Sequence, residues 1–182
     1  MLLDDIKKYR PCNEQERQDK EIIISFLENN PDAFLRENKL AHMTASSWIV
    51  NPQRTKTLMV YHNLYDSWSW TGGHADGETD LLKVAMKEAT EETGVGVKAV
   101  SGEIYSLEIL TVDGHEKKGE YVPSHLHLNV TYLLEADESS PLKACPGENS
   151  AVAWFSFEEA LKKSTEPWFV ERIYKKLIKG CE

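Results

Sequence analysis

A single strong helical pattern lies among strand patterns in this 182-residue chain, and it limits the folds that the chain can adopt. Residues 80–93 form the strongest predicted helix, with Asp80 or Thr79 as its N-cap and Gly94 at its end. Strand patterns lie on both sides of it, at residues 45–50, 57–61, 68–70, 97–100, 104–112, 126–134 and 152–155. One helix within a region of strands is not a repeating βαβ array. It predicts an α+β fold, an α/β/α sandwich on a mixed sheet.

Helical patterns also lie at both ends of the chain, at residues 14–30, 32–38, 157–163 and 166–179. We therefore expect a helical N-terminal extension over residues 1–40 and a main domain over residues 41–182. The sequence leaves open whether the extension covers the sheet or forms a homodimer contact.

Composition narrows the class of protein. The net charge is −9, from 21 basic and 30 acidic side chains, which would repel a phosphate backbone, so nucleic-acid binding is not expected. A small anionic substrate remains compatible if a bound cation supplies positive charge. No run approaches ~20 apolar residues, so no membrane span is expected. Three cysteines at distant positions, Cys12, Cys145 and Cys181, favour a reducing, cytoplasmic compartment.

Three carboxylates share one face of the predicted central helix. Glu88, Glu91 and Glu92 are spaced i, i+3, i+4, so they lie within an arc of roughly 100°. Three clustered acids alone are usually solvated surface, but Gly72-Gly73 before the helix reverses that expectation, because glycines let main-chain atoms approach a ligand closely. Hard divalent cations bind such sets of carboxylate oxygens, together with phosphates and water.

This segment resembles the Nudix box, whose pattern is G, five residues, E, seven residues, then R-E-U-x-E-E-x-G-U with U aliphatic. Here Gly73 opens it and K-E-A-T-E-E-T-G-V, residues 87–95, closes it. Lys87 stands where the pattern has Arg, and a Lys cannot hold a carboxylate with a two-pronged fork. A gap-free match places Thr79 at the first Glu position, with Glu78 one residue early.

The resemblance implies a Nudix-type sheet flanked by helices, with residues 41–182 as the catalytic domain. It implies a cytoplasmic enzyme that hydrolyses the pyrophosphate bond of a nucleoside diphosphate linked to another moiety. It also implies Mg²⁺ or Mn²⁺ bound by the three helix glutamates and the carbonyl of Gly72. The expected catalytic residues are Lys87, Glu88, Glu91, Glu92 and Glu148, and the general base is not assigned among the carboxylates.

Several candidates lie outside the helix. Glu148, in a Pro-Gly loop, either reaches the metals or the attacking water, or is a solvated loop acid. Four residues are candidate substrate contacts, each with a structural alternative in the core, on the surface or in a loop: Trp70, His74, Lys118 and His127.

One strand pattern places polar groups on a single face. His125, His127 and Asn129 alternate with Leu126, Leu128 and Val130, so the polar three either line a pocket or face water. A zinc site at His125 and His127 is not expected, because no third soft ligand lies near them in sequence.

Three alternatives stay open. A non-catalytic nucleotide or diphosphate sensor on the same fold is compatible with Lys87 and Thr79, although the three retained glutamates argue against it. An isopentenyl diphosphate isomerase would require a cysteine near the pocket, and the cysteines lie away from the strand that leads into Gly72. A protein-interaction domain would bind no metal.

Overall fold

The computed structural model describes residues 1–117 and 119–181. The strands of this part of the chain are β1 (Ala41–Val50), β2 (Lys56–His62), β3 (Ser67–Ser69), β4 (Thr71–His74), β5 (Val97–Ala99), β6 (Ser106–Val112), β7 (His115–Lys117), β8 (Glu120–Val122), β9 (His125–Ala136) and β10 (Asn149–Ser156). The α-helices are α1 (Leu2–Lys8), α2 (Glu14–Asn29), α3 (Leu81–Thr93), α4 (Phe157–Lys163), α5 (Pro167–Phe169) and α6 (Lys175–Cys181). None of these helices has the length and apolar character that a membrane span needs.

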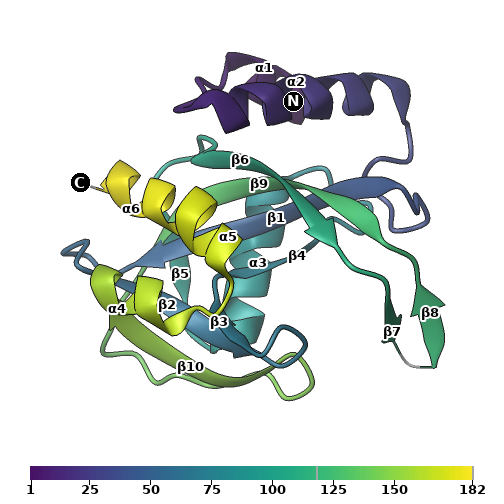
Figure 1. Ribbon diagram of the computed structural model, residues 1–182. Coiled ribbons are helices and arrows are strands. Elements are labelled where there is room, and N and C mark those ends of the chain that lie inside the picture. Colours follow the sequence, from purple (N-terminus) through teal and green to yellow (C-terminus); the bar gives the residue numbers. More distant parts are fainter. Residues whose placement is uncertain (118, 182) are drawn as a thin grey trace.

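β1 is central to the main sheet, which has the order β10-β2-β1-β9-β5. β3 pairs with β2, β4 with β1 and β6 with β9. β1 and β9 run parallel along ten register pairs, from Ala41 opposite Leu126 to Val50 opposite Glu135, whereas the other pairings are antiparallel. β7 and β8 form a separate hairpin that projects from the sheet (Figure 1). The mixed sheet between helices confirms the predicted α+β fold.

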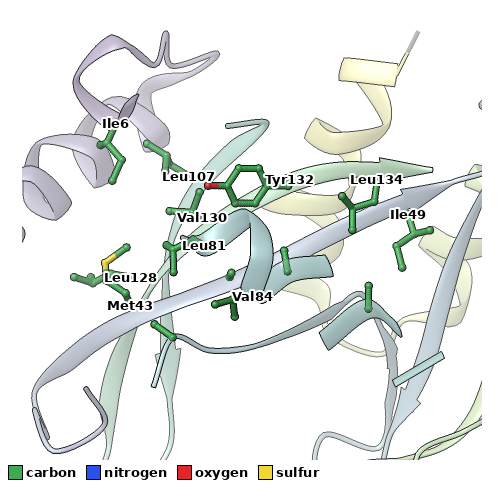
Figure 2. Packing of buried hydrophobic residues seen from close by; sticks show 14 of the residues in the cluster. Ile6, Met43, Ile49, Leu81, Val84, Leu107, Leu128, Val130, Tyr132 and Leu134 are labelled. Carbon is green, nitrogen blue, oxygen red and sulfur yellow. The ribbon is translucent and has the colours of Figure 1, made fainter. Parts of the chain in front are cut away.

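Helices cover both faces of the sheet, because the strands alternate between two apolar clusters. Ile49 of β1 packs in one cluster with Leu81 and Val84 of α3, while its neighbour Trp48 packs in the other with Leu177 of α6. In Figure 1, α6 lies in front of β1 and α3 behind it, and Figure 2 shows the side chains of the α3 cluster. α3 is thus fixed against the sheet along its apolar side, which leaves its acidic side at the border of the core.

The N-terminal helices cover the β6 side of the sheet (Figure 1). Ile6 of α1 and Ile23 of α2 are fully buried in the cluster that contains Leu107 of β6. The seven-residue α1 was not predicted from the sequence; its acidic first turn and basic last turn suit the helix dipole. The N-terminal segment therefore covers the sheet, which is one of its two expected roles. A homodimer contact stays a prediction.

Residues 32–38 do not form the short helix expected from the sequence. They form successive turns, in which the N–H of Leu35 donates to the carbonyl of Asp32 and the N–H of Asn38 donates to that of Leu35. The Asn38 side chain donates back to Asp32 and accepts from the N–H of Ala41, so it satisfies backbone and side-chain groups in a way that competes with a helix.

The C-terminal helix is interrupted, although the sequence predicts one helix over residues 166–179. A π-helical turn, Val170–Tyr174, separates α5 from α6. The wider turn allows Ile173, Tyr174 and Leu177 to be buried together, and the Tyr174 ring stacks on Trp48 with the ring centres 5.5 Å apart.

A buried charged network connects both ends of the chain to the sheet. Nζ of Lys176 on α6 lies 3.0 Å from Glu16 on α2 and 2.9 Å from Glu108 on β6, and both carboxylates are fully buried. Glu16 also accepts hydrogen bonds from the Tyr9 hydroxyl and the Cys12 N–H, each at 2.8 Å. Burial raises the pKa of Glu16, but Lys176 and these donors outweigh it and lower the pKa overall.

Candidate active site

A side-chain cap at Asp80 and a left-handed glycine at Gly94 fix the start and end of the helix that carries the three glutamates. Asp80 accepts a 3.1 Å hydrogen bond from the N–H of Lys83, so it is the N-cap. Gly94 ends the helix in the left-handed conformation, with φ of 75°. Both observations confirm the capping expected from the sequence.

Glu88 lies directly against Gly73, the second glycine of the Gly72-Gly73 pair. A Cβ atom at Gly73 would lie 2.5 Å from Cδ of Glu88 and 2.6 Å from its Oε2, a distance that real Cβ contacts do not reach. At Gly72, a Cβ would meet the Ser46 hydroxyl at 2.5 Å. The Ala45 carbonyl oxygen would also lie 2.8 Å from a Cβ at Gly72, so glycine is needed there, whereas a Cβ at Gly73 would displace the Glu88 carboxylate.

Glu92 is buried, with 4% of its surface exposed, at the junction of α3 and β4. Its Oε1 accepts a 2.9 Å hydrogen bond from the N–H of Gly72. Burial raises the pKa of Glu92 to about 8, and the carboxylates of Glu88, Glu148 and Glu91 act in the same direction, against the Gly72 hydrogen bond. Such an environment favours a cation beside the carboxylate.

Lys87 supplies one positive charge to the cluster. Its Nζ lies 3.1 Å from Glu88 and 3.1 Å from Glu91, and Glu91 is largely exposed. Lys83, the other lysine of this helix, pairs with Glu78 at 2.6 Å. One lysine thus faces several carboxylates, and the cluster retains an excess of negative charge.

Glu78 does not take the place of the missing first glutamate of the motif. Its Oε1 accepts from the N–H groups of Thr79 and Asp80, while its Oε2 pairs with Lys83. It acts at the beginning of the helix, and it does not line the cavity described next.

A cavity of about 680 Å³ borders the cluster, and Glu148 lines it together with Glu88, Glu92, Gly73 and His74. The loop that carries Glu148 is fixed to α3. Asn149 is 2% exposed, and its side-chain N–H donates to the Glu92 carbonyl at 3.0 Å while its Oδ1 accepts from the N–H of Cys145 at 3.1 Å. Sequence reasoning missed Asn149, although it follows Glu148 directly.

Arg36 is a second cavity residue that the sequence did not indicate. It comes from the turn before β1 and pairs with Asp76 through two hydrogen bonds, both 2.5 Å long. A guanidinium held in a fixed orientation suits phosphate oxygens. The segment around Arg36 matches no sequence motif. Its position at the cavity is therefore visible only in the folded structure.

The predicted substrate contacts occupy different environments. His74 lines the main cavity, and it also lines an adjoining cavity of about 180 Å³ together with Trp70 and His127. Trp70 is 7% exposed and packs against Phe169 and Tyr174, as a core tryptophan does. Burial lowers the pKa of His127 to about 2, with His74 and other nearby groups acting in the same direction. Lys118 lies outside the described residues.

The donor set fits a hard divalent cation. Glu88, Glu91 and Glu92 offer only oxygen atoms, and the glycine pair leaves room for main-chain approach beside them. The cavity next to them is large enough to admit a diphosphate group. The three helix glutamates and the glycine pair are therefore brought together as the sequence suggested.

The described residues also contain a cluster of four histidines that the sequence did not reveal. His42, His74, His125 and His127 offer ring nitrogens that all lie within 4.8 Å of one another. They come from β1, β4 and β9.

Comparisons with known proteins identify the family of the chain. The model of the NUDIX domain family matches residues 40–177. The m7GpppN-mRNA hydrolase NUDT17 of Xenopus laevis is 32% identical over 114 residues, which are 59% of this chain and 36% of that protein. The chain thus matches only about a third of the length of this relative.

Solved structures share the fold. A NUDIX hydrolase from Nitrosomonas europaea has a TM-score of 0.58 at 18% identity over 77% of this chain and 90% of its own. The MutT protein of Methanosarcina mazei Go1 has a TM-score of 0.53 at 17% identity, over 78% and 96% of the two chains. A C. elegans Ap4A hydrolase, solved as a binary complex, has a TM-score of 0.50 at 16% identity, over 76% and 93%. The family match, the helix glutamates and the shared fold lead to one conclusion: this chain belongs to the Nudix family.

Proposed function

We propose that this chain is a pyrophosphohydrolase, which uses Mg²⁺ or Mn²⁺ to cleave a nucleoside diphosphate linked to another moiety. The observation that carries the proposal is the position of Glu88 and Glu92 against the Gly72-Gly73 pair, beside a cavity of about 680 Å³. Membership of the Nudix family and the hydrolase names of its relatives support an enzyme of this class.

Glu88, Glu91, Glu92 and the Gly72 carbonyl would hold the cation. When bound, the cation supplies positive charge that offsets the diphosphate and favours deprotonation of the attacking water. The residues of the chain supply position: the Gly72 hydrogen bond orients Glu92, and Asn149 fixes the loop of Glu148 against the same helix.

Hydrolysis adds water across the P–O–P bond. The water oxygen bonds to one phosphorus atom, the bridging P–O bond breaks, and a proton of the water passes to a carboxylate. Glu148 or one of the helix glutamates takes that proton. Glu88, Glu92 and Glu148 line the cavity, and Glu91 belongs to the same carboxylate cluster.

For the substrate we propose Arg36 as a phosphate contact, because its guanidinium is already oriented by Asp76 at the cavity. Trp70, His74, Lys118 and His127 stay predicted substrate contacts. A cytoplasmic compartment stays a prediction that rests on the three distant cysteines of the sequence.

A substrate panel tests the proposal. The panel contains nucleoside diphosphate sugars, modified nucleoside triphosphates, dinucleoside polyphosphates and an m7GpppN cap dinucleotide, each with Mg²⁺, Mn²⁺ or a chelator, and products are separated by ion-exchange chromatography. We expect the wild type to cleave at least one compound in a metal-dependent reaction. Glu92→Gln should cleave that compound much more slowly. Tight binding of a compound without cleavage of any would contradict hydrolysis and favour the diphosphate sensor.

A further inference from the structure

The four-histidine cluster contains His42, His74, His125 and His127, and strand pairing assembles it. In the parallel register of β1 and β9, His42 lies opposite His127. In the antiparallel register of β1 and β4, Thr44 lies opposite His74. The side chains of His42, His125 and His127 therefore meet at one end of the sheet together with the end of β4, although 85 positions separate His42 from His127.

Backbone carbonyl groups orient two of the rings. Nδ1 of His42 lies 3.0 Å from the carbonyl oxygen of Asn38, and Nδ1 of His125 lies 2.8 Å from that of Pro123. A carbonyl only accepts, so Nδ1 carries the proton in each ring, and in the neutral ring Nε2 holds the lone pair. A hydrogen bond from one ring nitrogen to a carbonyl is the usual support of a histidine that binds metal through the other.

Ring nitrogens of His42, His125 and His127 are placed as metal ligands would be. His42 is 4% exposed, and its Nε2 is buried without a hydrogen-bond partner among the described residues. Nε2 of His125 lies 3.1 Å from Nε2 of His127. Two nitrogen ligands of a tetrahedral zinc ion lie about 3.3 Å apart, since each Zn–N bond is about 2.0–2.1 Å.

The chemistry of the donors selects the metal. All four are imidazole nitrogens, and the cluster includes no carboxylate or thiolate. Imidazole suits zinc and neighbouring transition metals, whereas Mg²⁺ and Ca²⁺ prefer oxygen ligands. We propose that His42, His74, His125 and His127 form a tetrahedral site for Zn²⁺ or a similar transition-metal ion, separate from the carboxylate cluster on α3.

The site would fix the strand end that bears the glycine pair. His74 follows Gly73 directly, so a metal bound to His74 connects that segment to β1 and β9. Four protein ligands leave no open position, which is the arrangement of structural rather than catalytic zinc. In this proposal the rings of His74 and His127 bind metal instead of substrate, and Arg36 is the residue that contacts the substrate phosphate.

Cobalt spectroscopy tests the proposal on the full chain. Co²⁺ absorbs visible light strongly in tetrahedral sites and weakly in octahedral ones, so it distinguishes the histidine cluster from the carboxylate cluster. After chelation and titration with Co²⁺, we expect one strongly absorbing ion in the wild type. The variant Glu88→Gln, which alters the carboxylate cluster, and His115→Ala, a histidine outside the four, should retain this signal.

His74→Ala and His125→Ala should weaken Co²⁺ binding at the tetrahedral site at least ~10-fold, because even the loss of a group that only supports a ligand costs ~10–100-fold. Neither ring is fully buried, which favours folding of both variants, and circular dichroism checks it. A tetrahedral signal that survives both substitutions would overturn the proposal, as would a wild type with only the weak octahedral spectrum.

X-ray absorption at the zinc edge gives a second readout that needs no variant. The wild type loaded with one equivalent of Zn²⁺ should show a first shell of imidazole nitrogens. A first shell of oxygen atoms alone would place the ion among the carboxylates and contradict the assignment.

Discussion

The carboxylate of Glu92 accepts a 2.9 Å hydrogen bond from the backbone N–H of Gly72, twenty positions earlier in the chain. This contact joins the acidic side of α3 to β4. It orients a buried carboxylate toward the same cavity that Glu88 and Glu148 line. The proposed chemistry depends on this junction between a helix and a glycine pair.

Replacement of Glu92 by Gln should abolish most turnover. Gln can still accept from the N–H of Gly72, so the junction is retained while the negative charge is lost. We expect a fall in kcat of at least ~10²-fold, the scale of a lost metal or base function, with little change in the free energy of unfolding. Steady-state kinetics and urea denaturation measure the two quantities.

Glu158→Gln is the matched control for that substitution. Glu158 is an exposed acid of α4 that pairs with Lys162 on the surface. Its substitution should leave kcat unchanged. If Glu92→Gln kept full activity, the assignment of Glu92 to the active site would be wrong.

Gly73→Ala should damage activity more than stability. The new Cβ would overlap the carboxylate of Glu88, which is the movable end of a side chain, so the clash is relieved by displacement of that carboxylate. A misplacement of about 1 Å can cost ~10²-fold in rate. Gly102→Ala is the control, because nothing lies within 4 Å of a Cβ there. Equal kinetics for the two variants would show that the position of Glu88 does not matter.

Lys176→Met should strongly destabilise the fold. It removes the cation that lies between two fully buried carboxylates, Glu16 and Glu108. Loss of one partner of a buried ion pair costs about 3–5 kcal/mol. Its neighbour Lys175 forms an exposed surface pair with Glu171, so Lys175→Met should change the free energy of unfolding by no more than about 0.5 kcal/mol. Similar urea midpoints for both variants would contradict the importance of the network.

Acid should weaken the contribution of Glu16. The pKa of Glu16 is lower in the folded protein than its ordinary value of 4.5. The ionised group therefore stabilises the fold fully above pH 4.5, and this stabilisation is lost as the pH falls through the lower folded pKa. The difference in unfolding free energy between wild type and Glu16→Gln should be constant above pH 4.5 and shrink below it. If this difference in unfolding free energy grew on acidification, the pKa of Glu16 would be raised in the folded protein rather than lowered.

Much of the carboxylate cluster was predictable because its determinants are local. The spacing of Glu88, Glu91 and Glu92 sets a shared face through helix geometry alone, and Asp80 and Gly94 mark the ends of that helix. The alternation of residues 125–130 likewise predicted the shared face of His125, His127 and Asn129. These patterns need no information about distant parts of the chain.

The rest depends on strand pairing and helix packing between distant segments. The sequence does not indicate a metal site at His125 and His127, because no third soft ligand lies near them in the chain. The pairing of β1 with β9 and β4 brings His42 and His74 beside them. Arg36 resembles any surface arginine in sequence. Lys176 lies on a helix with exposed lysines on either side, so nothing local shows that it is the buried one.

Anomalous diffraction from a crystal soaked in Mn²⁺ tests most directly that the carboxylates of α3 hold the catalytic cation. We expect a manganese peak in contact with the carboxylates of Glu88, Glu91 and Glu92 and with the Gly72 carbonyl. A map without a peak there, with Lys87 still paired to Glu88 and Glu91, would contradict this expectation.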